Sequence, residues 1–254
     1  MAEVFRFAET AVKSSPVTFV CYSERGLISY LMFRYFYKEK NLKNFLKQIQ
    51  LIDNQQNPFR SNLRKTPINS IRIFSECDLG DFGCPDGIIA FEFNTNKYLI
   101  FIEAKLNESV EQSNKGKRYG STINGQLELK WRMFYSYFEL NQKERIEEND
   151  DLHKFYEKDN VQQRILNLNS NGVALLFENY FKKVDAKNIF FIALTNEKNN
   201  TCPFVNRQKI CVNEKFKKFN NNFGWINIKK FFKDELVTKG LLKYKRIKDS
   251  WENY

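Results

Sequence analysis

Three ionisable residues stand at the borders of an otherwise apolar part of this chain. Asp86 precedes it and Glu103 and Lys105 end it, with two apolar runs and a short polar segment at residues 94–97 between them. Carboxylates and an ammonium group are costly to bury unless they pair with one another or bind a metal ion. These residue types at this spacing therefore indicate either an ion-paired cluster or a metal site with a lysine beside it.

Two apolar runs around a short polar segment are typical of a β-hairpin. In an antiparallel hairpin the start of the first strand lies beside the end of the second, so Asp86 is expected next to Glu103 and Lys105. Side chains alternate between the faces of a strand, which places Glu103 and Lys105 on one face and Ala104 on the other. The hairpin thus gathers the three charged groups at one end.

This pattern resembles the signature of the PD-(D/E)xK nuclease superfamily, which includes restriction enzymes, Holliday-junction resolvases and repair nucleases. Pro85-Asp86 and Glu103-Ala104-Lys105 match the two halves of that signature, with a hairpin-sized gap between them. The resemblance implies a metal-dependent hydrolase of phosphodiester bonds in DNA, a deoxyribonuclease that we expect to be an endonuclease.

The resemblance also implies a role for each of these residues. Asp86 and Glu103 would be ligands of Mg²⁺, or of Mn²⁺ in its place, and the main-chain carbonyl of Ala104 would be a further ligand. Lys105 would orient the attacking water or help to deprotonate it. Mg²⁺ prefers oxygen ligands and keeps several waters, so two or three carboxylates suffice. The alternative is a surface ion pair at a hairpin end, worth about 0–1 kcal/mol.

Further polar residues resemble auxiliary positions of the superfamily. Glu24, at the start of a predicted helix, resembles an acidic residue that completes the metal site; alternatively it is a carboxylate favoured by the helix N-terminus. Glu76 competes with Glu24 for that role. Gln126 resembles a glutamine that supports the lysine or the scissile phosphate, and Lys130 lies one turn later on the same helix edge. The alternative for both is a solvated helix edge.

The charge of the chain favours a polyanionic partner. Its formal net charge is +11 and its pI is about 9.3, although such charge also serves solubility. Basic side chains can fix a protein on DNA through backbone phosphates, and solvated loop charge is the alternative. The candidate nucleic-acid contacts are Arg60, Arg64, Lys65, Lys115, Lys117, Arg118 and Lys130.

The remaining pattern predicts an α/β fold with a mixed central sheet flanked by helices, and the resemblance implies a restriction-endonuclease-like core with helical insertions. We expect a single nuclease-like domain over residues 1–254, with its core at 23–230, a charged helical insertion at 144–168 and a basic tail at 229–254. Besides the hairpin, the pattern predicts helices at 23–31, 38–54, 124–140 and 172–182, a basic loop at 57–68, and strands at 70–76, 188–194 and 224–228.

Several other chemistries are disfavoured. The five cysteines form no CxxC pair, so a zinc site is not indicated, and reduced thiols in the cytoplasm are expected. The single histidine, His153, lies in a charged segment without a motif for nucleophilic catalysis. No apolar run is long enough to span a bilayer, so no membrane partner is expected.

Other functions stay open on the sequence alone. The first is a non-catalytic nucleic-acid-binding protein on the same fold, and the second is a protein-interaction or defence module whose charge is incidental. A nuclease of the same chemistry directed at RNA is a third, and a homodimer is also compatible with the sequence.

Overall fold

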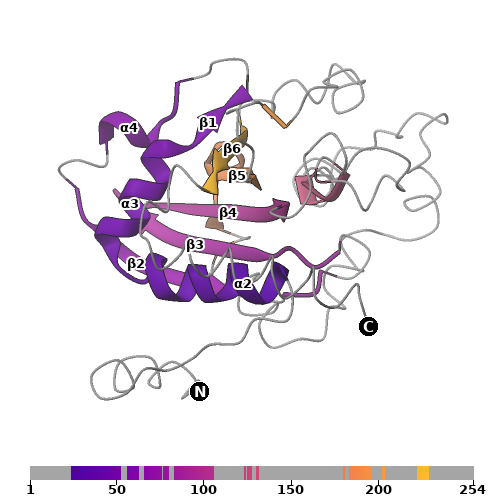
Figure 1. Ribbon diagram of the computed structural model, residues 1–254. Coiled ribbons are helices and arrows are strands. Elements are labelled where there is room, and N and C mark those ends of the chain that lie inside the picture. Colours follow the sequence, from indigo (N-terminus) through magenta and orange to yellow (C-terminus); the bar gives the residue numbers. More distant parts are fainter. Residues whose placement is uncertain are drawn as a thin grey trace, which may run out of the picture.

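The computed structural model describes residues 24–52, 56–62, 66–75, 77–79, 83–105, 123, 125–127, 130–131, 180, 183–195, 202–203 and 222–228 (Figure 1). The helical elements are α2 (Glu24–Leu31), which continues into the π-helix η2 (Met32–Phe36), then α3 (Glu39–Gln48), α4 (Phe59–Asn62) and the 3₁₀ helix η7 (Ala186–Asn188). The strands are β1 (Gln50–Leu51), β2 (Ile68–Phe74), β3 (Gly87–Phe93), β4 (Asn96–Lys105), β5 (Ile189–Thr195) and β6 (Phe223–Asn227).

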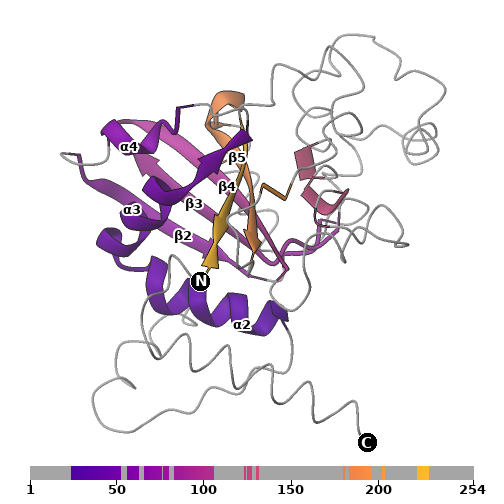
Figure 2. The same ribbon diagram turned by 45° about the horizontal axis from the view of Figure 1, so that its top comes forward.

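The strands form one mixed sheet in the order β1-β6-β5-β4-β3-β2 (Figure 2). Strands β2, β3 and β4 form an antiparallel meander. Strand β4 then pairs in parallel with β5, β5 pairs in parallel with β6, and β1 closes the edge antiparallel to β6. The predicted α/β class with a mixed sheet is confirmed.

The predicted hairpin is formed by β3 and β4. Its loop has two residues, Asn94 and Thr95, with φ angles of 49° and 66°. Positive φ at both central residues is the requirement of a type I′ turn, whose twist suits two-residue hairpins. The register pairs Gly87 with Ile102, so Asp86 and Glu103 follow as the next neighbours at the open end. The predicted placement of Asp86 at that end is confirmed.

One face of the sheet packs against α2, η2 and α3. At Gly87 the helical layer comes close to the strand, because a Cβ atom there would lie 2.1 Å from the Sδ atom of Met32. Glycine therefore allows η2 to pack directly on the start of β3. The buried cluster on this face includes Ile28, Leu31, Met32, Leu42, Phe45, Leu46, Ile89, Phe91, Ile100, Ile102, Ala104, Phe190, Ile192, Leu194 and Ile226.

The opposite face carries a row of aromatic rings. The Phe101 and Phe191 rings stack at 5.6 Å and the Phe191 and Phe223 rings at 5.1 Å. Trp131 continues the row, with its ring centroid 6.4 Å from that of Phe223. The helical residues that the structure describes between 123 and 131 are thereby anchored to this face of the sheet.

The region after α3 differs from its prediction. The helix expected over residues 38–54 ends at Gln48 and is followed by β1. The Asn57 side-chain amide donates hydrogen bonds of 2.8 Å to the carbonyls of Leu46 and Ile49, which satisfies acceptors at the end of the helix. The predicted basic loop at 57–68 also contains the short helix α4. The predicted end of the helix at residue 54 and the loop prediction were therefore wrong.

The other predicted elements agree in type where they are described, except at Tyr180, which is a turn residue within the helix expected at 172–182. The strand expected at 70–76 is β2, displaced by two residues, and those at 188–194 and 224–228 are β5 and β6 within one residue. The insertion at 144–168, the tail at 229–254 and, apart from Tyr180, the helix at 172–182 lie outside the described residues. None of the helices within the described ranges is long and apolar enough to cross a membrane.

Candidate active site

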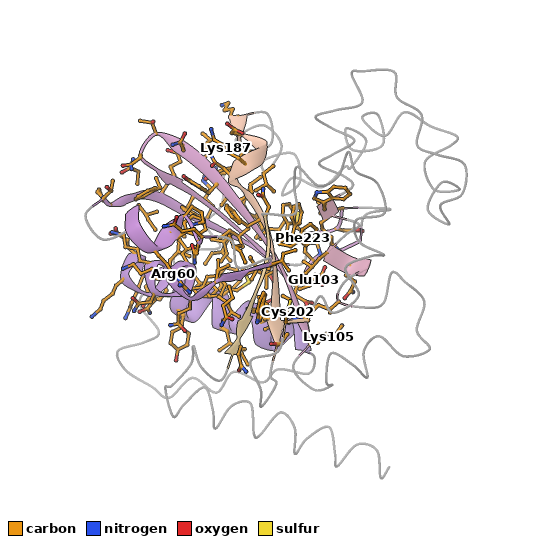
Figure 3. The ribbon with its side chains drawn as sticks, turned by 90° about the horizontal axis from the view of Figure 1, so that it is seen from above. Arg60, Glu103, Lys105, Lys187, Cys202 and Phe223 are labelled. Atoms are coloured by element: carbon orange, nitrogen blue, oxygen red, sulfur yellow. The ribbon has the colours of Figure 1, made fainter. Side chains whose placement is uncertain are left out.

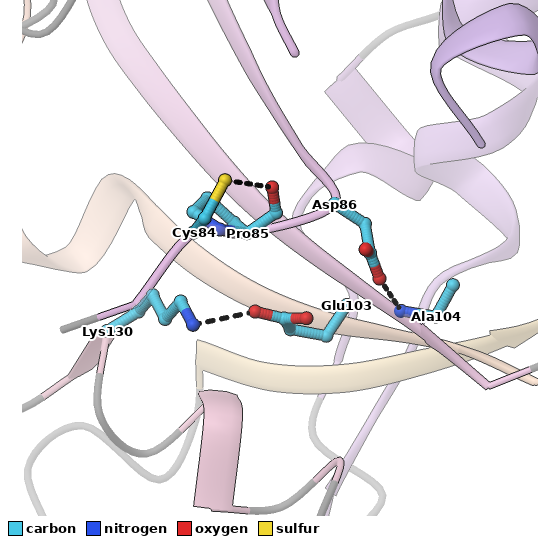
Figure 4. A network of polar contacts seen from close by, with 6 residues as sticks. All are labelled: Cys84, Pro85, Asp86, Glu103, Ala104 and Lys130. Atoms are coloured by element: carbon cyan, nitrogen blue, oxygen red, sulfur yellow. Dashed lines mark hydrogen bonds and ion pairs between the residues drawn. The ribbon is translucent and has the colours of Figure 1, made fainter. Parts of the chain in front are cut away.

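The open end of the hairpin carries two neighbouring buried carboxylates. Asp86 and Glu103 are 8% and 1% exposed. Gly87 and Ala104 lie against the α2 face, so Asp86 and Glu103, one residue earlier on each strand, project from the other face. The Oδ2 atom of Asp86 accepts a hydrogen bond of 2.7 Å from the Ala104 amide (Figure 4). This bond fixes the Asp86 carboxylate beside the end of β4.

Glu103 forms an ion pair with Lys130. The Lys130 Nζ atom lies 2.7 Å from Glu103 Oε1, and both side chains are almost fully buried (Figure 4). Gly83, at φ +75°, lies beside the ammonium group, because a Cβ atom there would be 3.2 Å from Nζ. We expected Lys130 on a helix edge that meets nucleic acid. The structure instead places it at 1% exposure, facing the sheet and not the surface.

Burial and the neighbouring positive charges act in opposite directions on the pKa of Glu103. Burial raises the pKa of Glu103 from its ordinary 4.5 to about 7. The Lys130 ammonium acts in the opposite direction and lowers this pKa, whereas the Asp86 carboxylate raises it and Lys105 lowers it. Desolvation thus outweighs the positive charges, and Glu103 at neutral pH is poised between its charged and neutral forms.

The donor set fits a hard divalent cation. Two adjacent carboxylates supply oxygen ligands of the kind that Mg²⁺ prefers, and a cation would offset the burial and the Asp86 charge that raise the pKa of Glu103. Within the part of the chain that the structure describes, no three His, Cys, Asp or Glu side chains are grouped. At the open end of the hairpin, the described carboxylates that could bind the cation are therefore Asp86 and Glu103.

Lys105 lies at the end of the same strand. It is the last residue of β4, is half-buried, and pairs in register with Thr195 of β5. Strand alternation places it on the face of Glu103, and its charge lowers the pKa of Glu103. The ammonium group is thus close enough to the acidic pair to act on it electrostatically.

Gln126 lies on the described helical segment, one turn before Lys130. Its Oε1 atom is buried and accepts no hydrogen bond from the residues that the structure describes. A buried acceptor without a donor is costly, so a water or ligand that donates to it would be stabilised. The side chains of Ile123 and Leu127 are fully buried, so this segment has an inward-facing stripe.

Glu24 begins α2, but its side chain lies outside the described residues. Ser29, a little over one turn later, hydrogen-bonds to the Ser75 hydroxyl. Ser75 follows Phe74, which pairs with Ile88 at the start of β3. The part of α2 around Ser29 therefore lies at the sheet end that carries the acidic pair.

The basic candidates are only partly described. Arg60 is exposed on α4, and its Nε atom donates a hydrogen bond of 3.3 Å to the Lys47 carbonyl. It lies apart from Glu103 and Lys105 (Figure 3). Arg60 would therefore contact a different part of any bound polymer than the acidic pair. The side chains of Arg64, Lys65, Glu76, Lys115, Lys117 and Arg118 lie outside the described residues.

The fold and the site define a class in chemical terms: a mixed α/β protein with a buried acidic pair and a lysine at the open end of a central hairpin. No protein-family model matches the chain, and neither a curated protein nor a solved structure matches it. The function must therefore be argued from the residues of this site.

Proposed function

We propose that this protein is a metal-dependent nuclease of the PD-(D/E)xK type that hydrolyses phosphodiester bonds in DNA. The observation that carries the proposal is the open end of the β3–β4 hairpin, where Asp86 and Glu103 are buried side by side and Lys105 follows on the same face. The meander followed by a parallel strand is also the element order expected of a restriction-endonuclease-like core.

Each residue would have a distinct task. Asp86 and Glu103 would hold Mg²⁺ or Mn²⁺ together with the Ala104 carbonyl. The bound ion would neutralise charge on the phosphoryl group and lower the pKa of a water molecule. Lys105 would orient the attacking water as an ammonium group or, with its amine unprotonated, accept the proton of that water. Gln126 would donate its amide N–H to the phosphate side of the site, and Glu24 would be an auxiliary acid at the start of α2.

DNA is the substrate that the charge of the chain favours. The net charge of +11 attracts any polyanion, and phosphate contacts by basic side chains do not depend on base sequence. Arg60 is the exposed member of the candidate contacts among the described residues. RNA carries the same backbone charge, so substrate competition must separate the two.

A second candidate is a non-catalytic nucleic-acid-binding protein on the same fold. The observation that favours it is the Glu103–Lys130 ion pair at 2.7 Å, since a lysine already supplies Glu103 with a counter-ion. Such a protein would retain DNA in a salt-sensitive manner and cleave nothing.

The test is an incubation of the purified protein with supercoiled plasmid, single-stranded DNA and structured RNA, each with Mg²⁺, Mn²⁺ or EDTA. The nuclease predicts metal-dependent cutting that disappears in Asp86→Asn, with the plasmid or the single strand preferred to RNA. Salt-sensitive retention of DNA without cutting would select the binding protein instead. If DNA is neither cut nor retained, both proposals are wrong.

A further inference from the structure

Lys130 is a buried cation for which the proposed chemistry has no task. It is 1% exposed, and lysine is almost never so buried unless it is paired. Its partner is Glu103, at 2.7 Å, which is one of the two carboxylates of the acidic pair. The Lys130 ammonium group thus lies against a Glu103 oxygen that the proposed metal ion would need as a ligand.

The position of Lys130 is built into the fold from two sides. Trp131, the next residue, packs its ring against Phe223 of the central sheet at 6.4 Å, which anchors the helical segment. On the other side Gly83 has φ +75°, and any Cβ there would come within 3.2 Å of the Nζ atom. The glycine leaves the space that the ammonium group occupies, three residues before Asp86.

We propose that Lys130 is a resident counter-ion that competes with the divalent cation for Glu103. The inference rests on the metal site of the proposed function. The Lys130 ammonium holds Glu103 Oε1 at 2.7 Å and stabilises the buried carboxylate. A divalent cation on the pair is repelled by this ammonium, so it binds fully only when Nζ moves away from Oε1. Because the helical segment is anchored by Trp131, the movement is made by the lysine side chain.

The competition has a defined consequence for metal affinity. Replacing Lys130 by glutamine removes the repelling charge, while the amide can still donate a hydrogen bond to Glu103. Lys130→Gln is therefore expected to bind a divalent cation at least roughly tenfold more tightly than the wild type. Lys130→Arg keeps the charge and adds a bidentate grip on the carboxylate, so it is expected to bind the cation more weakly than the wild type.

Isothermal titration of the full chain with CaCl₂ tests the inference without any substrate. Lys97→Gln is the matched control, because it also removes a lysine charge that pairs with a glutamate of the hairpin, but from the half-exposed pair with Glu92. Its calcium affinity is expected to equal that of the wild type. Tighter binding in Lys130→Gln alone supports the competition. Equal or weaker binding in Lys130→Gln, tighter binding in Lys130→Arg, or no binding in any of the proteins overturns it.

The result is separable from the fate of the proposed function. If Lys130→Gln binds calcium more tightly but the wild type cleaves no DNA, the competition is supported and the nuclease proposal is contradicted. If the wild type cleaves DNA in a metal-dependent manner but Lys130→Gln has the same calcium affinity as the wild type, the nuclease proposal is supported and the competition is contradicted. If Lys130→Gln does not fold, the Lys130→Arg titration decides the matter.

Discussion

The two ends of the central hairpin carry the same kind of ion pair in opposite surroundings. At the turn, Lys97 lies 3.0 Å from Glu92, and the two side chains are 22% and 34% exposed. At the open end, Lys130 lies 2.7 Å from Glu103, and the two side chains are 2% and 1% exposed. The distances are similar, so burial is the property in which the two pairs differ.

This difference decides what each pair contributes. An exposed pair contributes about 0–1 kcal/mol because water screens it. A buried pair has lost the hydration of both ions, so breaking it costs about 3–5 kcal/mol, although a well-packed apolar replacement is often no less stable. Burial of Asp86, Glu103 and Lys130 together is therefore poorly explained by stability alone, and a site that uses the carboxylates explains it better.

The largest expected effect concerns the lysines nearest to each end of β4. If Lys105 orients or deprotonates the attacking water, Lys105→Ala lowers the rate of DNA cleavage by about 10²–10⁴-fold, the usual contribution of a general base. Lys97→Ala, at the other end of the same strand, should cleave at the wild-type rate. Initial rates of plasmid nicking in Mg²⁺ measure both. Equal rates in the two variants would mean that the open end is no more catalytic than the turn.

The next effect is on stability. Lys130→Met leaves Glu103 buried without its partner and should lower the free energy of unfolding by about 3–5 kcal/mol. Lys97→Met breaks the half-exposed pair and should cost at most about 1 kcal/mol. Urea unfolding followed by circular dichroism measures the two values. Similar losses in both variants would show that the buried pair contributes no more than the exposed one.

The pH dependence of stability compares Glu103 at the open end of the hairpin with Glu92 near the turn. Burial raises the pKa of Glu103 in the folded protein from 4.5 to about 7, so the folded state holds a proton that the unfolded state releases in this interval. The contribution of this protonation is complete below about pH 4.5 and is lost as the pH rises through about 7. Glu103→Gln stays neutral, so its stability relative to the wild type should increase between about pH 5 and pH 8.

Glu92→Gln is the control for that experiment, because it removes a carboxylate from the half-exposed ion pair near the turn of the same hairpin. The free energy of unfolding is measured for the three proteins at each pH. A flat or falling difference for Glu103→Gln would mean that the folded protein does not retain this proton.

A smaller effect is expected from the packing beneath the site. Gly87→Ala places a methyl group 2.1 Å from the present position of Met32 Sδ, so the methionine must move. Overpacking of this kind costs about 1–3 kcal/mol. Thermal unfolding of Gly87→Ala, Met32→Ala and the double variant measures it. The double variant should be more stable than the sum of the single losses predicts, and strict additivity would contradict the contact.

The hairpin could be predicted from the sequence because its determinants are local. Two apolar runs, the polar segment at 94–97 and the charges at one end specify two strands and the neighbours Asp86 and Glu103. Strand β1 could not be predicted in this way. It has two residues, and its pairing partner β6 lies far along the chain, so its register depends on a long-range contact.

The partner of Glu103 was missed for a similar reason. Helical periodicity places Lys130 on an edge of its helix but does not say which edge faces the sheet. The left-handed Gly83 that makes room for its ammonium group gives no signal on its own. The end of α3 was also missed, because Asn57 caps it from a later segment of the chain. Contacts distant in sequence thus account for what local patterns could not predict.

The most direct test of the central claim compares one acid from each end of the hairpin. The initial rate of Mg²⁺-dependent plasmid cleavage is measured for the wild type, Asp86→Asn and Glu92→Gln at equal protein concentration. Both variants remove one carboxylate charge from β3 or its border. The account predicts that Asp86→Asn loses cleavage by at least about 100-fold, while Glu92→Gln keeps the wild-type rate. Wild-type cleavage by Asp86→Asn would contradict a catalytic site at the open end of the hairpin.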